Sequence, residues 1–124
     1  MPHPSQPPPR LLVADQVAGR ISLLDLPDGG EVAALDHRHL AEHAGFLALP
    51  DGLVACVDDR AGELLLLDQY GPDAGRPLVR RRIPVAVPAE HLAAAPGGRR
   101  LAVTTGLGRN EEPWTGLLTA VDLE

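Results

Sequence analysis

The feature that most constrains the fold is a short unit that the chain repeats. An apolar run, a turn rich in Pro and Gly, and a second apolar run occur at residues 44–57 (AGFLALPDGLVACV) and again at residues 91–103 (HLAAAPGGRRLAV). Two apolar runs on either side of such a turn predict a β-hairpin. In the first copy the turn is Pro50-Asp51-Gly52. Each of these residues favours a turn, because Pro fixes φ, Asp bonds to nearby backbone and Gly accepts positive φ.

A longer segment recurs around this unit. The sequence LVADQVAGRISLLD at residues 12–25 is similar to LVACVDDRAGELLLLD at residues 53–68, and both contain an Ala-Gly turn between two apolar runs. The two segments begin 41 positions apart and end 43 positions apart. A third copy begins at Leu101, 48 positions after Leu53, and contains a longer internal loop. A period of about 40 to 50 residues is typical of the blades of a β-propeller. The same strand of each copy ends in an aspartate, at Asp25, Asp68 and Asp122.

These features are similar to the YVTN and WD-like β-propeller repeats, in which a hydrophobic strand, a turn like Ser-Pro-Asp-Gly and a Leu-x-Val strand recur once in each blade. The turn corresponds here to residues 49–52 and 95–98, and the following strand to residues 53–55 and 101–103. The Trp-Asp dipeptide of the WD repeats is absent from the sequence, so the resemblance to the YVTN family is the better one. The resemblance covers residues 11–124. It implies a fold without implying an activity, since propellers host unrelated functions.

The apolar runs predict three strands in residues 11–36, four in residues 44–87 and three in residues 91–124. We therefore expect an all-β protein, a partial β-propeller of repeated antiparallel four-stranded blades, whose first blade lacks its inner strand and whose last lacks its outer strand. A closed propeller has at least four blades. Because unpaired edges invite association, such a segment is expected either to belong to a longer ring or to self-associate through its open sheet edges. Residues 1–10 contain five prolines and are expected to form a disordered tail.

Charge and composition exclude several classes of protein. The net charge is −6 and the pI is about 5.2, which disfavours nucleic acids and anionic membranes as partners. No apolar run approaches the length of a membrane span, and the start of the chain lacks the basic and apolar regions of a secretory signal. A cytoplasmic location is therefore expected, unless the start of the chain is misplaced. The single cysteine, Cys56, lies in an apolar run and is expected to be a buried, inert thiol.

Histidines are the residues whose pattern suggests chemistry. The tripeptide Ala-Glu-His occurs at residues 41–43 and 89–91, in both cases where one blade is expected to cross to the next. In propellers that resemble this chain, such a crossing lies on the face where the central channel opens. Two further histidines, two residues apart on an expected extended segment, would share a face, and imidazole is a good ligand for zinc and copper. The alternative is that these side chains cap turns or lie in solvent. The candidate metal ligands are His37, His39, His43 and His91.

The third copy carries an expanded loop at residues 106–116, longer than the corresponding turns of the other two copies. A Trp in an irregular loop is a common anchor for a partner, because it offers a large contact area. The alternative is a Trp folded back over the sheet edge. The candidate partner-binding residues are Asn110, Glu111, Glu112 and Trp114.

Motifs of catalysis are absent from the sequence, which contains neither a GxSxG elbow nor a phosphate-binding P-loop. Asp15, Asp58 and Asp59 stand at the start of tight hairpins, where Asp is a turn former, and the Arg run at residues 80–82 is typical of a protected outer strand. We therefore expect a non-catalytic binding or scaffold module without a cofactor, whose protein partner or small ligand the sequence does not identify. The alternative is a metal-handling or metal-dependent propeller, a zinc or copper binder or a lactonase-like enzyme, that uses channel-facing histidines.

Overall fold

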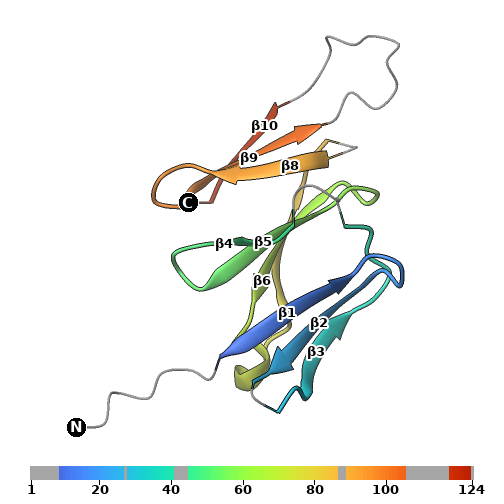
Figure 1. Ribbon diagram of the computed structural model, residues 1–124. Helices are drawn as coiled ribbons and strands as arrows, with labels where there is room; N and C mark the ends of the chain where they lie inside the picture. The colour runs from blue at the N-terminus through green and yellow to red at the C-terminus, as the bar shows by residue number, and fades with distance from the viewer. Residues whose placement is uncertain (1–8, 27, 41–44, 87–88, 106–117, 124) are drawn as a thin grey trace, which may run out of the picture.

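The computed structural model describes residues 9–26, 28–40, 45–86, 89–105 and 118–123, and most of these residues lie in β-strands (Figure 1). The strands are β1 (Arg10–Asp15), β2 (Arg20–Asp25), β3 (Glu31–Leu35), β4 (Leu47–Ala48), β5 (Leu53–Asp58), β6 (Glu63–Asp68), β7 (Val79–Pro84), β8 (Ala89–Ala94), β9 (Arg100–Thr105) and β10 (Leu118–Asp122). A 3-10 helix, η1 (Pro72–Ala74), lies between β6 and β7. In the described ranges no helix is long and apolar enough to cross a membrane.

The strands form three antiparallel sheets. The first sheet has the order β1-β2-β3, the second β4-β5-β6-β7 and the third β10-β9-β8. Figure 1 shows the sheets side by side in a row, with the second sheet between the other two. The all-β class and the expected order of three, four and three strands are confirmed. The first strand begins at Arg10, and residues 1–8 of the expected tail lie outside the described residues.

The hairpin registers show how the copies correspond. Arg10 pairs with Asp25 in the first sheet, and Leu53 pairs with Asp68 in the second. The two hairpins therefore correspond residue for residue at a spacing of 43 positions. The comparison of sequences placed Leu12 opposite Leu53, which is wrong by two residues at that end. The sequence match depended on the shared letters Leu-Val-Ala. In the structure the equivalent residues of the two hairpins are instead those at the same number of positions from the tight turn.

The strands β5 and β6 are buried on both faces because a sheet packs on each side of them. In β5, Val54 and Cys56 pack with residues of the first sheet, whereas Ala55 and Val57 pack with residues of the third. In β6 the same alternation places Leu65 and Leu67 toward the first sheet and Leu64 and Leu66 toward the third. This double burial explains why β6 reads as an unbroken apolar run rather than an alternating one. Cys56 is 1% exposed, which confirms the predicted burial of its thiol, and this burial raises the pKa of Cys56 to about 12.

The two outer sheets of the row each have one covered and one open face. Ile21 in β2 is fully buried against the second sheet, and Val121 in β10 is 7% exposed. On the opposite faces, Leu11 and Val13 in β1 are 45% and 41% exposed, and Leu118 in β10 is 68% exposed. The row thus exposes apolar side chains at both of its ends.

A buried cation ties the first sheet to the segment that follows β6. The side chain of Arg10 is 3% exposed. Its Nη1 donates to the carbonyl oxygen of Gln69 over 2.9 Å, its Nη2 donates to the carboxylate of Asp73 over 2.7 Å, and its Nε lies 2.7 Å from Oδ1 of Asp25. The guanidinium also lies 5.3 Å from the centre of the Tyr70 ring. The hydrogen bond to Asp73 raises the pKa of Arg10. Because both partners are charged, this bond is charge-assisted.

The turns of the second and third sheets touch each other. The β4–β5 turn contains Pro50 and Gly52, and the β8–β9 turn contains Gly97 and Gly98, as predicted. Gly98 has a φ of +70°, and a Cβ atom built on it would lie 2.3 Å from Cδ of Pro50. Gly97 has a φ of +89°, and nothing lies within 4 Å of its added Cβ. Gly98 is therefore required both by backbone conformation and by the approach of the neighbouring turn.

We predict that Gly98→Ala lowers the free energy of unfolding by more than Gly97→Ala. Both substitutions place an Ala in the left-handed region, at a cost of about 1 to 2 kcal/mol, but only the methyl group at position 98 displaces the ring of Pro50. Urea unfolding followed by circular dichroism measures both values. Equal losses for the two variants would contradict the contact between the turns.

Candidate functional site

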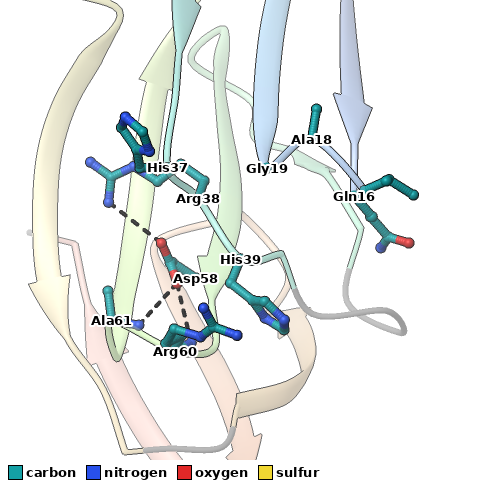
Figure 2. A pocket seen from close by; sticks show the side chains of 10 residues that line it. Gln16, Ala18, Gly19, His37, Arg38, His39, Asp58, Arg60 and Ala61 are labelled. Atoms are coloured by element: carbon teal, nitrogen blue, oxygen red, sulfur yellow. Dashed lines mark hydrogen bonds and ion pairs between the residues drawn. The ribbon is translucent and has the colours of Figure 1, made fainter.

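An open hollow of about 540 Å³ lies between the first and second sheets. Three segments line it, namely the β1–β2 turn at residues 16–19, the segment after β3 at residues 37–39, and the β5–β6 turn with Asp58, Arg60 and Ala61 (Figure 2). All three segments connect strands, so the sheets hold the hollow without contributing much of its lining. Loops on a rigid scaffold are where binding residues are concentrated in proteins.

Two equivalent turns shape the hollow. In the β5–β6 turn, Oδ1 of Asp58 accepts hydrogen bonds from the backbone N–H groups of Arg60 and Ala61, over 3.1 and 2.9 Å. In the β1–β2 turn, Oδ1 of Asp15 accepts from the residues at the same two spacings, over 3.1 and 3.0 Å. The expected structural use of both aspartates is confirmed, because each carboxylate holds its own turn.

Arg38 joins the three segments that line the hollow. Its backbone N–H donates to the carbonyl oxygen of Gly19 over 2.9 Å. Its Nη1 lies 3.5 Å from Oδ2 of Asp58 and donates to Oε1 of Glu63 over 3.1 Å. The side chain of Asp58 is only 2% exposed, and a buried carboxylate is costly without a partner. Arg38 therefore supplies the charge that the buried β5–β6 turn requires.

The remaining charged groups at the hollow are cations or histidines. Arg60 is exposed and forms no ion pair within the part of the chain that the structure describes. His37 is exposed and has a φ of +61°, which is unusual for a residue other than Gly. His39 forms a hydrogen bond through Nδ1 with Oδ1 of Asp59. The lining thus combines two guanidinium groups and two imidazoles with a carboxylate, Asp58, that is already paired.

The structure places the candidate metal ligands in different environments. His37 and His39 both line the hollow, but the positive φ of His37 interrupts the extended segment, and Figure 2 shows the two rings pointing to different sides. His91 lies in β8 of the third sheet, where its Nδ1 is 3.4 Å from Oγ1 of Thr104. His43 lies outside the described residues. Among the residues described, no three His, Cys, Asp or Glu side chains are grouped as a metal site.

The expanded loop of the third copy also lies outside the described residues, with all four of its candidate partner-binding side chains, Asn110, Glu111, Glu112 and Trp114. Arg38 and Arg60 are not among the residues that the sequence pattern predicts for a site. Arg38 lies between His37 and His39, which the sequence suggested as metal ligands. Its contact with Asp58 joins two sheets. The sequence shows only that an Arg lies in the segment that crosses between two blades. Its partner, Asp58, can be identified only once the packing of the sheets is known.

Comparisons with known proteins identify the fold. No family model matches the chain, and no curated protein matches it by sequence. Among solved structures, dihydro-heme d1 dehydrogenase NirN in complex with DHE is similar, with a TM-score of 0.70 and 23% identity over 98% of this chain and 23% of that chain. Hydrazine synthase of Kuenenia stuttgartiensis is similar with a TM-score of 0.63 and 12% identity, over 91% of this chain and 29% of that chain.

Both neighbours contain β-propellers, so the three sheets are the blades of a partial β-propeller. The chain spans less than a third of the length of either neighbour. At these identities the likeness shows the fold alone.

We predict that Arg38→Gln lowers the free energy of unfolding by about 2 kcal/mol, because it leaves the buried carboxylate of Asp58 without its cation. Arg60→Gln is the matched control, since this Arg is exposed and unpaired in the described residues, and it is expected to change stability by less than about 0.5 kcal/mol. Chemical denaturation of both variants measures the difference. Similar values for the two would show that Arg38 does not support the turn.

Proposed function

We propose that this chain is a segment of a YVTN-type β-propeller that acts as a non-catalytic binding module, and that its hollow binds the anionic group of a small ligand. The observation that carries the proposal is the charge of the lining. Arg38 and Arg60 contribute two guanidinium groups, and the carboxylate of Asp58 is neutralised by Arg38. Because Arg38 is already paired with Asp58 and Glu63, the positive charge that an entering anion would meet is the guanidinium of Arg60, which forms no ion pair in the described residues.

Arg60 is the residue expected to contact the ligand. Its backbone N–H is bonded to Asp58, which fixes the start of its side chain, while the side chain itself is exposed. A planar guanidinium recognises carboxylate and phosphate groups through paired N–H donors. His37, on the opposite segment of the lining, offers a further ring nitrogen. Arg38 is a positioning residue here, because its charge is committed to Asp58 and Glu63.

Two further points support a binding module of this family. The turn and strand pattern that resembles the YVTN repeats falls on the β4–β5 and β8–β9 hairpins. The NirN neighbour was solved in complex with DHE, which makes ligand binding a reasonable role for a related fold. The loop that contains Trp114 stays a predicted contact for a protein partner.

Titration calorimetry with inorganic phosphate and with citrate tests the proposal. We expect weak binding that decreases as NaCl is added, because salt screens exposed charges. Arg60→Gln is expected to weaken binding about tenfold, the equivalent of one charge-assisted contact of about 1.4 kcal/mol. Arg81→Gln, on the exposed face of β7 away from the hollow, is the control and should bind as the parent does. Absence of binding of both anions, or an equal loss in the control, would refute the proposal.

A metal site at the hollow is the second candidate, and one contact favours it. The carboxylate of Asp59 engages Nδ1 of His39, and metal-binding histidines commonly bond a carboxylate through their other ring nitrogen. Nε2 of His39 would then be the ligand, with His37 on the same lining. The exposed guanidinium of Arg60 at the hollow opposes a bound cation, which is why we place this candidate second.

Zinc and copper titrations separate the two candidates. If the metal reading is right, Zn²⁺ or Cu²⁺ binds at micromolar concentration, and His39→Ala reduces the affinity at least tenfold. His91→Ala is the control, because this residue lies in the third sheet and not in the lining. Binding that survives His39→Ala and His37→Ala together would place the metal elsewhere.

A further inference from the structure

β7 is the outer strand of the second sheet, and one of its edges is open. Within the part of the chain that the structure describes, β7 pairs only with β6. The N–H of Val85, directly after the strand, donates to the carbonyl oxygen of Gly62 over 2.8 Å. Because the direction of the backbone groups alternates along a strand, those of Arg81 also point toward β6, whereas those of Arg82 and Pro84 point outward. Pro84 has no N–H to lose at such a position.

The exposed side chains of this strand are cationic in an acidic protein. Arg80, Arg81 and Arg82 are all exposed, although the net charge of the chain is −6. Nη1 of Arg80 donates to Oδ2 of Asp68 over 3.2 Å. Arg81 and Arg82 form no ion pair among the described residues. Two guanidinium groups at this edge are therefore available to carboxylates.

A groove of about 610 Å³ lies between β3 and β7, and the three arginines border it. We call it the β3–β7 groove. Ala33, Leu35 and Val79 supply apolar groups to its lining. Arg82 pairs with Leu65, whose side chain packs toward the first sheet, and directly opposite residues of two strands share a face. The guanidinium of Arg82 therefore lies on the face of β7 that borders the groove.

We propose that an acidic peptide in extended conformation binds along the open edge of β7, where it adds a strand to the second sheet and fills part of the β3–β7 groove. Its backbone pairs with the outward N–H and C=O of Arg82, which is how peptides extend an exposed sheet edge. Two neighbouring acidic residues of the peptide point to opposite faces. One of them meets Arg82 and the other meets Arg81. This partner is separate from the small ligand of the proposed function.

The charges favour this partner over two others. A second copy that paired through its own β7 would place Arg opposite Arg, and like charges directly opposite destabilise a sheet. A nucleic acid carries a dense row of phosphates, which the net charge of −6 repels. A short peptide with two carboxylates matches the two available guanidinium groups and adds little further negative charge.

Fluorescence anisotropy with the labelled peptide Thr-Val-Glu-Glu-Val-Thr tests the proposal on the full chain. We expect saturable binding that weakens as NaCl is added. Arg82→Gln is expected to weaken binding about three- to fivefold, the effect of one cross-strand pair of opposite charge. Arg60→Gln is the control, because this side chain lines the hollow and not the β3–β7 groove, and it should bind the peptide as the parent does.

Charge reversal gives the most specific result. Arg81→Glu combined with Arg82→Glu should abolish binding of this peptide and create binding of the same peptide with Lys in place of both Glu residues. Both side chains are exposed, so the circular dichroism spectrum should stay that of the parent. A peptide that is N-methylated at both Glu residues keeps its charge but loses two backbone donors. It should bind at least tenfold more weakly than the unmodified peptide.

Five results would each overturn the proposal. They are absence of binding, equal binding of the N-methylated peptide, an equal loss in Arg60→Gln and Arg82→Gln, failure of the reversed chain to bind the Lys peptide, and tighter binding of single-stranded DNA than of the Glu peptide. Phosphate and citrate have no backbone that could pair with β7. The binding of anions at the hollow is therefore measured separately, and either proposal can fail without the other.

Discussion

The burial of β5 and β6 on both faces is the constraint on which the rest of the structure depends. Each of these strands presents alternate residues to two different neighbours, and the two neighbours are sheets built from similar hairpins. A single four-stranded sheet with two apolar faces would be unstable in water, because half of its apolar surface would stay exposed. The first and third sheets cover these two apolar faces, and the second sheet therefore lies between them.

The position of the hollow follows from this packing. When two sheets with equivalent hairpins stack face to face, their tight turns come to the same end of the stack, and the chain that crosses between them passes beside both. Arg38 lies on that crossing. It therefore meets the buried Asp58 of one turn and the backbone of Gly19 in the other. The ion pair at the hollow is thus a result of how the sheets join, because the crossing segment brings Arg38 to a place where a carboxylate is buried.

Much of the fold could be predicted from the sequence because its signals are local. Apolar runs with period two, turns of Pro, Asp and Gly, and aspartates that end equivalent strands identify the three units and their strands. The register was partly missed, because the match of Leu12 to Leu53 depends on letters that recur by chance in strands rich in Leu, Val and Ala. Of the residues that line the hollow, His37 and His39 were among the predicted site residues, whereas Arg38 and Arg60 were not. The ion pair between Arg38 and Asp58 joins two sheets, and the left-handed backbone at His37 leaves no mark in the sequence.

The double burial of β6 has one more consequence, which concerns how the strand is aligned. In a strand with one polar face, a slip of one residue turns charged groups into the core, so the pattern itself enforces the pairing. In β6, four consecutive leucines would present the same chemistry to both neighbours after such a slip. Alignment must then be set at the ends of the strand, by Asp58 in its turn and by Asp68, whose carboxylate contacts Arg76 and Arg80. The register of β6, whose residues from Leu64 to Asp68 are all buried, is thus determined by polar residues at the ends of the strand.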